Sequence, residues 1–383
     1  MKRRKIFIDG GPLAEEKMSG VGASTLETVR ALALKKDILD THEIHLLIAA
    51  NKRHLLDRHH LDKTVHITPI YIKARIINGL TKFNILPPMD LLFGRGVYIF
   101  PNFKNWPLLF SKSVTYVHDV AFRLYPQYIQ KQNLLMLNAS IERYLKRTDA
   151  IVTVSNSSKN DLLGSFPELS NSKVHVVHNG VDRAEYNLGS RESSQGIKDK
   201  YNLPEEYFLF ISNLEPRKNV RTLLNAFELF ADENASVGLV LVGGMGWNNE
   251  DVYARIDTLK RRGLLIIKPN AYVPDEDLPG LIAGSIALVH PAHHEGFGMS
   301  PLQAIACGTP VVVSDIPSLR EVIGDVGVYL KDINNARELS GLMKQVYNSR
   351  ITKKDRELLS AQADKYQWKD TITSLVDVIK GLE

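Results

Sequence analysis

Short apolar runs alternate along this chain with segments in which apolar residues recur every three or four positions. The runs are four to eight residues long and rich in Val, Ile and Leu, as at 286–289, which is typical of strands buried on both faces. The other segments predict amphipathic helices. Because the two kinds alternate, we expect an α/β protein with doubly wound parallel sheets.

The alternation falls into two series. The first predicts strands and helices in this order: strand 5–9, helix 25–34, strands 43–49, 65–72, 97–100 and 113–117, helix 133–146, strand 150–154, helix 157–165 and strand 174–177. The second predicts strands at 207–211, 237–242, 264–267, 286–289 and 310–314, with helices at 220–230, 251–262, 277–283, 319–323, 336–348 and 353–363. Residues 187–200 are polar and lack apolar periodicity, as linkers do. We therefore predict a first domain at 1–186, a linker at 187–203, a second domain at 204–365 and a final helix at 366–383.

Length and composition agree with two globular domains. The chain has 383 residues, of which 44% are hydrophobic and 24% charged. Cys307 is the only cysteine, which excludes a disulfide framework and a zinc–cysteine cluster. The apolar start at 6–8 is too short for a signal peptide, and no run reaches the roughly 18 apolar residues of a membrane span. A cytoplasmic protein is expected.

The first half of the chain is basic and the second half acidic. Two stretches of the first half, 73–83 and 104–112, mix bulky apolar and basic residues. Such segments can dock a protein on an anionic membrane, here at its inner face, but they also fit a core helix with solvated ends and an aromatic loop. No motif that reads nucleic acid accompanies the positive charge, so a nucleic-acid partner is not expected.

The stretch 293–303 carries the strongest candidate chemistry. It follows the strand at 286–289 and leads into a helix, so it places Glu295 and free backbone N–H groups at the carboxyl edge of a sheet. Gly296 and Gly298 let the backbone approach a ligand, and a helix start favours anions. The alternative is an ordinary strand-to-helix turn with a solvated glutamate.

Two more turns end strands of the same predicted sheet. Arg217 and Lys218 follow the strand at 207–211, and adjacent cations there suit a diphosphate. Gly243 and Gly244 follow the strand at 237–242. Because parallel strands end at one edge, these groups can converge with Glu295. A solvated cationic turn is the alternative interpretation of Arg217 and Lys218.

His118 ends a strand of the first domain, where it could bind a polar substrate or shuttle a proton, although a lone histidine is more often structural. The glycine loop at 19–22 lacks the dinucleotide-binding spacing. The paired histidines, 59–60 and 293–294, have no further ligands nearby in sequence, so we assign no metal.

Taken together, these motifs give the chain a family resemblance over nearly its whole length. It resembles the retaining GT-B glycosyltransferases of family 4, also called glycosyl transferases group 1. The matching stretches, in the family's order, are 19–22 (SGVG), 117–119 (VHD), 153–158 (TVSNSS), 178–182 (HNGVD), 215–219 (EPRKN), 295–298 (EGFG), 306–312 (ACGTPVV) and 318–322 (SLREV). Each is weak alone, but this many in order are specific.

The resemblance implies two Rossmann-like domains facing a cleft, with the last helix crossing back to the first domain. It implies a nucleoside-diphosphate sugar bound without metal or cofactor. Arg217 and Lys218 would bind the diphosphate, Glu295 the sugar hydroxyls, and His118 would face the reacting sugar. The remaining donor-binding residues implied are Gly20, Gly22, Gly243, Phe297, Gly298, Met299, Ser300 and Gln303.

Two positions depart from the family's pattern. Gln303 stands where a second glutamate usually contacts the ribose, and Asn213 where many relatives carry arginine. The expected activity is transfer of mannose or glucose, from GDP-mannose or UDP-glucose, to a glycan or lipid-linked saccharide in polysaccharide biosynthesis. A catalytically weak binding or assembly protein, and an epimerase or phosphorylase of the same fold, are the alternatives.

Overall fold

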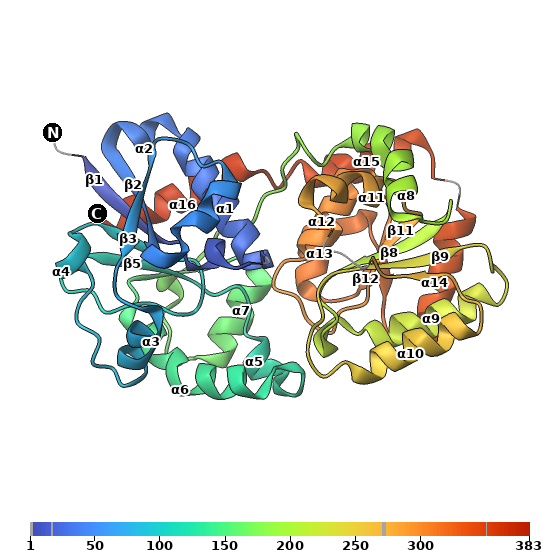
Figure 1. The fold of residues 1–383 in the computed structure, drawn as a ribbon, viewed down its shortest axis with the longest axis horizontal. Coiled ribbons are helices and arrows are strands. Elements are labelled where there is room, and N and C mark those ends of the chain that lie inside the picture. The colour runs from blue at the N-terminus through green and yellow to red at the C-terminus, as the bar shows by residue number, and fades with distance from the viewer. Residues whose placement is uncertain (1–2, 17, 270–272, 350) are drawn as a thin grey trace. The chain divides into compact units, whose positions relative to one another are not determined.

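The computed structural model describes residues 3–16, 18–269, 273–349 and 351–383. The chain forms two α/β units, each built on one parallel sheet (Figure 1). The first unit comprises 1–120, 132–180 and 368–383, and the second comprises 121–131 and 181–367. The predicted fold class, two doubly wound domains, is confirmed.

The first sheet has seven strands in the order β3-β2-β1-β4-β5-β6-β7. Alternate residues of the interior strand β1 face opposite sides, so Ile6 and Ile8 pack with helix α1 (Gly20–Leu34), whereas Phe7 stacks on Tyr98 with ring centroids 4.5 Å apart. The strands are β1 (Arg4–Asp9), β2 (His42–Ala49), β3 (Val65–Ile70), β4 (Val97–Phe100), β5 (Lys112–Tyr116), β6 (Ala150–Thr153) and β7 (Val174–Val176).

The two mixed segments of the first unit are each half core and half surface. In 73–83, Ile77 is buried while Phe83 is 71% exposed; in 104–112, Trp106 packs edge-on against Phe100 while Phe110 is exposed. Both segments therefore combine buried and exposed apolar side chains, and membrane docking stays a prediction. The other helices of this unit are α2 (Lys36–Thr41), η2 (Ala50–His59), α3 (Ala74–Lys82), α4 (Asp90–Phe93), α6 (Lys131–Arg147) and α7 (Asn156–Ser165).

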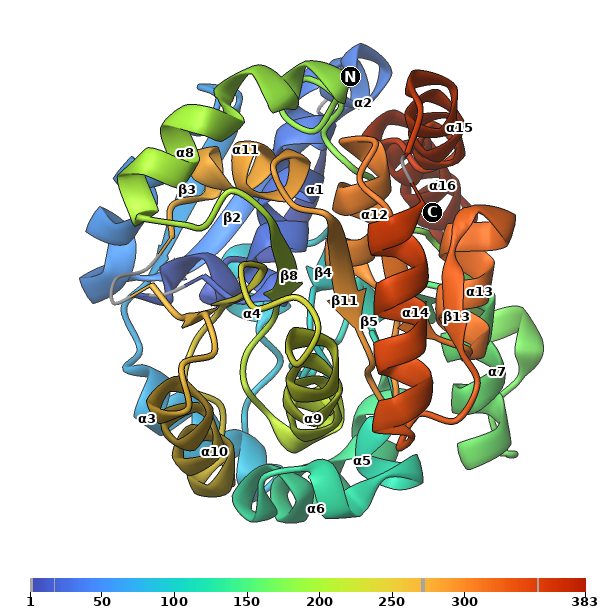
Figure 2. The ribbon, with the colours of Figure 1, turned by 90° about the vertical axis from the view of Figure 1, so that its right-hand side faces the viewer.

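The second sheet has six strands in the order β10-β9-β8-β11-β12-β13. Phe208 and Phe210 of β8 face helices α9 (Val220–Ala231) and α14 (Ala336–Asn348), which lie side by side in Figure 2. On the opposite face the Tyr207 hydroxyl donates to a carbonyl of α11. The strands are β8 (Tyr207–Ile211), β9 (Gly238–Val242), β10 (Ile266–Ile267), β11 (Ala287–His290), β12 (Val311–Ser314) and β13 (Val328–Leu330), and the further helices are α10 (Glu250–Arg261), α11 (Leu278–Ala283), α12 (Met299–Ala306), α13 (Pro317–Ile323) and α15 (Lys353–Ala363).

The prediction of a linker at 187–203 is wrong. This stretch forms a 3₁₀ helix, η5 (Leu188–Ser193), and helix α8 (Ser194–Tyr201), and both belong to the second unit. The Asn187 side chain caps η5 by accepting from the backbone N–H of Gly189 at 2.8 Å, and Ile197 is buried against α11. A cap and one buried apolar side chain fold a polar segment that has no visible periodicity. The chain passes between the units at 180–181 instead of 186–187.

Residues 121–131 form part of the second unit, although their neighbours in sequence on both sides belong to the first. They contain α5 (Ala121–Leu124) and η3 (Pro126–Tyr128). The Tyr128 ring stacks on His293 with centroids 4.6 Å apart, and its carbonyl accepts from the indole N–H of Trp247 at 3.2 Å. Because the partners are far apart in sequence, local patterning does not predict this docking.

The C-terminal helix α16 (Trp368–Leu382) lies in the first unit beside α1 (Figure 1). Its apolar face, including Ile372, Leu375 and Ile379, is buried in the core between α1 and the sheet. No helix in the described ranges is long and apolar enough to cross a membrane.

The contribution of α16 can be measured with Leu375→Ala. Leu375 is fully buried, so its truncation should lower the free energy of unfolding of the first unit by about 2–5 kcal/mol, through lost burial and a cavity. Urea unfolding gives the magnitude, and hydrogen exchange in α1 assigns the effect to this unit. Leu358→Ala, on the exposed face of α15, is the control. Equal stability of the two variants would show that α16 does not support this core.

Candidate functional site

Three loops end adjacent strands at the carboxyl edge of the second sheet. The loop after β8 leads through the 3₁₀ helix η6 (Pro216–Lys218) into α9, the loop after β9 contains Gly243, and the loop after β11 leads into α12. Since these strands are parallel neighbours, their loops meet at one edge. The structure brings Arg217, Lys218 and Glu295 into direct contact there.

Glu295 is the centre of this contact and is 9% exposed. Its Oε1 forms a buried ion pair with the Lys218 ammonium, and its Oε2 lies 3.4 Å from Nη1 of Arg217. Arg217 also donates from Nη1 to the His294 carbonyl at 2.7 Å and from Nη2 to Glu215 Oε1 at 2.7 Å. Two cations and two carboxylates therefore balance in a small volume, as buried charges require.

His290, the last residue of β11, is a site residue that the sequence analysis missed. Its Nε2 lies 2.6 Å from Oε1 of Glu295, and its ring stacks on Phe210. Its Nδ1 is buried with no hydrogen-bond partner among the described residues. The only sequence signal was a polar residue directly after the apolar run 286–289. Within the described ranges, no three His, Cys, Asp or Glu side chains are grouped as metal ligands.

The charges around Glu295 set its protonation state. Burial opposes ionisation of this carboxyl, but Lys218, Arg217 and the hydrogen bond from His290 outweigh burial and hold the pKa of Glu295 well below its usual value. Burial lowers the pKa of His290, against the opposing effect of Glu295. At neutral pH the pair is thus a carboxylate and a neutral imidazole that donates its Nε2–H, which leaves Nδ1 as an acceptor.

The backbone of the second loop approaches the first closely. Gly243 has φ +141°, and a Cβ there would lie 2.0 Å from the Ser212 carbonyl oxygen, so only glycine fits. The neighbouring Gly244 donates its N–H to Oδ1 of Asn213 at 3.0 Å. Asn213, noted in the sequence as a missing cation, therefore joins the loops after β8 and β9.

Helix α12 begins at Met299, directly after Gly298. Gly298 has φ +97° and provides no capping side chain, so the first turn of the helix lacks a side-chain cap. Ser300 donates its hydroxyl to the last carbonyl of β8 at 3.1 Å, and Phe297 packs edge-on against Tyr366. Gln303 lies one turn further along α12 and is partly exposed.

His118 lies in the first unit, after β5. Its Nε2 is 2.8 Å from the carbonyl oxygen of Pro101, which can only accept, so this nitrogen carries the proton. Burial lowers the pKa of His118, and the neutral ring keeps Nδ1 as an acceptor. A cavity of about 10 Å³, the size of one water, lies between His118 and Tyr116, whose hydroxyl has no partner among the described residues.

The predicted glycine loop of the first unit is part of a helix. We expected Gly20 and Gly22 to precede a helix, but α1 begins at Gly20. Ser19 is its N-cap and accepts from the N–H of Gly22 at 3.2 Å. A Cβ on Gly22 would lie 2.9 Å from the Pro12 carbonyl oxygen. Close packing at a capped helix start therefore explains Gly22, whereas a Cβ on Gly20 would meet no atom within 4 Å.

The link between His290 and the buried charges gives a pH-dependent prediction. Folding lowers the pKa of His290 from 6.5. Below about pH 6.5 the unfolded chain therefore binds a proton at this residue that the folded chain does not bind, and the free energy of unfolding falls. His290→Phe keeps a ring against Phe210 but removes this loss. Urea unfolding of the second unit between about pH 7.5 and 5.5 should show a smaller loss of stability in the variant.

His54→Phe, which makes the same exchange on an exposed surface, is the matched control for His290→Phe. If wild type and His290→Phe lost the same stability over this pH range, the result would contradict the assignment of a buried, neutral His290.

Two family models match the chain, one over most of the first unit and the other over most of the second. The model described as Glycosyltransferase Family 4 matches residues 18–185, and the model described as Glycosyl transferases group 1 matches residues 194–366. The second match contains every residue of the contact around Glu295. The two matches follow one another along the chain, as the resemblance in the sequence predicts.

Relatives and solved structures agree with these matches. O-antigen chain mannosyltransferase B of Escherichia coli is 28% identical over 389 residues, covering 95% of this chain and 97% of that protein. O-antigen chain mannosyltransferase RfbU of Salmonella typhimurium is 27% identical over 239 residues, 62% of each. Anabaena Alr3699/HepE, crystallised with UDP and glucose, shares the fold at a TM-score of 0.73, with 15% identity over 99% of this chain and 100% of that one. The chain belongs to the group 1 glycosyltransferases of GT-B fold.

Proposed function

We propose that this glycosyltransferase moves a mannosyl group from GDP-mannose to a hydroxyl of a glycan or lipid-linked saccharide, with retention of the anomeric configuration. The names of its relatives, two of them O-antigen chain mannosyltransferases, favour mannose over glucose. O-antigen is a polysaccharide, so a growing saccharide chain is the acceptor that these relatives suggest.

The observation that carries the proposal is the convergence of Arg217 and Lys218 on Glu295. Two cations held at the end of β8 form a preorganised site for a diphosphate, because a guanidinium can bind phosphate bidentately and an ammonium adds a compact charge. A bound diphosphate would neutralise part of the positive charge of Arg217 and Lys218 that Glu295 neutralises in its absence. The freed carboxylate oxygens could then accept hydrogen bonds from hydroxyls of the sugar.

The proposed catalysis is positioning and stabilisation of the leaving charge. Arg217 and Lys218 would neutralise the departing nucleoside diphosphate, so no metal ion or other cofactor is required for that task. Retention by a double displacement would call for two carboxyl groups about 5 Å apart across the scissile bond. Glu215, the second carboxylate in contact with Arg217, is itself buried and ion-paired. We therefore favour front-face transfer, in which the leaving diphosphate helps to deprotonate the acceptor hydroxyl.

His118 has a corresponding role in this proposal. Because its Nε2–H is held by the Pro101 carbonyl, only Nδ1 remains for a ligand, and it accepts. This hydrogen-bond acceptor can receive a hydrogen bond from a sugar hydroxyl, but it carries no proton to donate as a general acid. We propose that His118 orients the transferred sugar instead of donating a proton to the leaving group.

Lys218→Ala tests the central assignment. Release of GDP from GDP-mannose, in the presence of a mannose-terminated saccharide, should fall by about 10²–10³-fold, because one preorganised charge on the leaving group is lost. Lys218→Arg keeps the charge and should retain more turnover than Lys218→Ala. Lys260→Ala, on the last turn of α10, is the control for removal of an exposed lysine.

Thermal melting must show that Lys218→Ala is folded, since it leaves Glu295 with one cation fewer. Near-wild-type turnover by the folded variant would contradict the assignment. Consumption of the donor without a saccharide, or with inorganic phosphate in its place, would indicate an epimerase or phosphorylase.

Gln303→Glu tests donor binding and donor identity. A carboxylate accepts stronger hydrogen bonds than an amide, so a ribose contact at this position should tighten up to about tenfold. Bound donor raises the melting temperature by mass action, and the shift given by GDP-mannose should be larger in the variant than in wild type. Gln345→Glu, on the exposed face of α14, is the control for the added charge.

An unchanged shift in Gln303→Glu would show that residue 303 does not contact the donor. A larger shift of the wild-type protein with UDP-glucose than with GDP-mannose would contradict the proposed mannosyl donor.

A further inference from the structure

Most of the exposed large apolar side chains of the described chain belong to the first unit. More than half of the exposed large apolar residues in the described chain fall between 71 and 136. Phe83 and Ile85, just after α3, are 71% and 65% exposed, and Leu135 and Met136 on α6 are 64% and 62% exposed. Exposed apolar side chains that gather in one region mark an interaction surface more often than scattered ones do.

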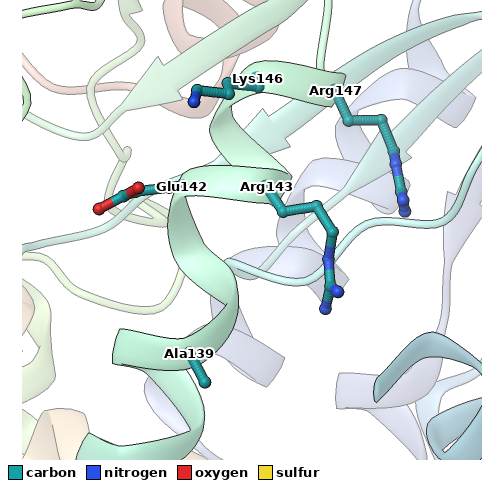
Figure 3. Close-up of a pocket in the computed structure, with 5 residues that line it drawn as sticks. All are labelled: Ala139, Glu142, Arg143, Lys146 and Arg147. Atoms are coloured by element: carbon teal, nitrogen blue, oxygen red, sulfur yellow. The ribbon is translucent and has the colours of Figure 1, made fainter. Parts of the chain in front are cut away.

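The second half of α6 adds a group of cations to this region. Arg143 and Arg147 are one turn apart and extend toward the same side of the helix (Figure 3). Arg147 donates to the Asn84 side-chain oxygen at 2.7 Å, an uncharged partner, and Nε of Arg143 has no hydrogen-bond partner among the described residues. Burial and the neighbouring Arg143 both lower the pKa of Arg147. These two guanidiniums are cations placed side by side.

The apolar and cationic residues share one face of α6. At 100° per residue, Leu135, Met136, Arg143, Lys146 and Arg147 all fall within an arc of about 120°. An open hollow of about 510 Å³ lies along this arc (Figure 3), lined by Ala139, Glu142, Arg143, Lys146 and Arg147. Of the buried residues of the helix, Ile141, Tyr144 and Leu145 lie outside this arc on the other side, and Ser140 lies at its edge, next to Arg147.

Asn84 lies in sequence between the exposed residues Phe83 and Ile85, and it connects them to this face of α6. Its side chain binds Arg147, so Phe83 and Ile85 lie beside the cationic end of α6. The result is one surface of the first unit with exposed apolar side chains and arginines together. We call it the α6 surface, and it consists of Phe83, Ile85, Leu135, Met136, Arg143, Lys146 and Arg147.

We propose that the α6 surface docks the first unit on an anionic membrane, with the apolar side chains among the lipid headgroups and the arginines on lipid phosphates. Arginine matches phosphate geometry, and apolar side chains beside it contribute burial that a soluble anion cannot offer. The proposal does not depend on the transfer reaction and can fail or hold independently of it.

The charge and the apolar side chains of the α6 surface together favour an anionic membrane over a second copy of the chain or a nucleic acid. A second copy of the chain, bound through the same surface, would bring arginine against arginine. A nucleic acid would match the arginines and could stack a base on Phe83, but Ile85, Leu135 and Met136 offer no ring for stacking. An anionic membrane is the partner that uses both parts of the surface.

Vesicle sedimentation with the full chain tests the proposal. The protein should bind vesicles of phosphatidylcholine and phosphatidylglycerol, and bind pure phosphatidylcholine vesicles much less. The double variant Arg143→Gln, Arg147→Gln should lower the partition coefficient roughly 30-fold, since two cations near the surface are lost. Raising the salt from about 0.1 M to 1 M should weaken binding by the wild type more than by this variant.

The matched control is Lys260→Gln, Arg261→Gln on the exposed last turn of α10 in the second unit, which changes the net charge equally. A second pair, Leu135→Gln, Met136→Gln, should also weaken binding, and Leu358→Gln on α15 should not. Absence of binding to anionic vesicles, or equal binding by the arginine variant and its control, would overturn the proposal. Binding of single-stranded RNA that needs the two arginines, without vesicle binding, would assign the surface to nucleic acid instead.

Discussion

The contacts at the carboxyl edge of the second sheet depend on one buried carboxylate. Glu295 stays ionised at low exposure only because Lys218, Arg217 and His290 surround it. Removing a single partner from such a group costs several kcal/mol, because the charge that remains cannot be solvated. The ends of β8 and β11 must therefore stay in register, since one provides the cations and the other provides the carboxylate and the imidazole. The buried carboxylate is thus paired with cations because β8 and β11 are neighbours in the sheet.

The same contact explains how two neighbouring cations can be held at this edge of the sheet before any ligand arrives. Arg217 and Lys218 would repel each other and move into solvent if nothing held them. Glu215 and Glu295 fix both side chains and bring the net charge of the four groups to zero. The diphosphate of the proposed donor would meet cations already in place, which would lower the entropy lost on binding. This diphosphate would have to compete with Glu295, so the proposed site would bind anions less tightly than two free cations but would orient them better.

Much of this could be predicted from the sequence, because it rests on local patterns. Continuous apolar runs marked the strands, and strand ends followed by Arg217, Lys218 and Glu295 indicated one edge of one sheet. His290 was missed because a single histidine after an apolar run resembles a loop residue until its distance to Glu295 is known. The sequence predicts a linker at 187–203 because a segment held by a side-chain cap and one buried isoleucine shows no apolar periodicity. The docking of 121–131 rests on rings more than 160 positions apart, which no local pattern records.

Segment 121–131 also helps to fix the position of Glu295. Tyr128 stacks on His293, Tyr125 lies against His294, and these two histidines directly precede the carboxylate. The N–H of His293 also donates to the Arg217 carbonyl at 2.8 Å. The loop is therefore held by rings on one side, by the β8 loop on another and by the His290 hydrogen bond at its base. A carboxylate fixed by three independent contacts cannot relax when one is lost, and for this reason the charges around it are better regarded as a rigid unit than as separate ion pairs.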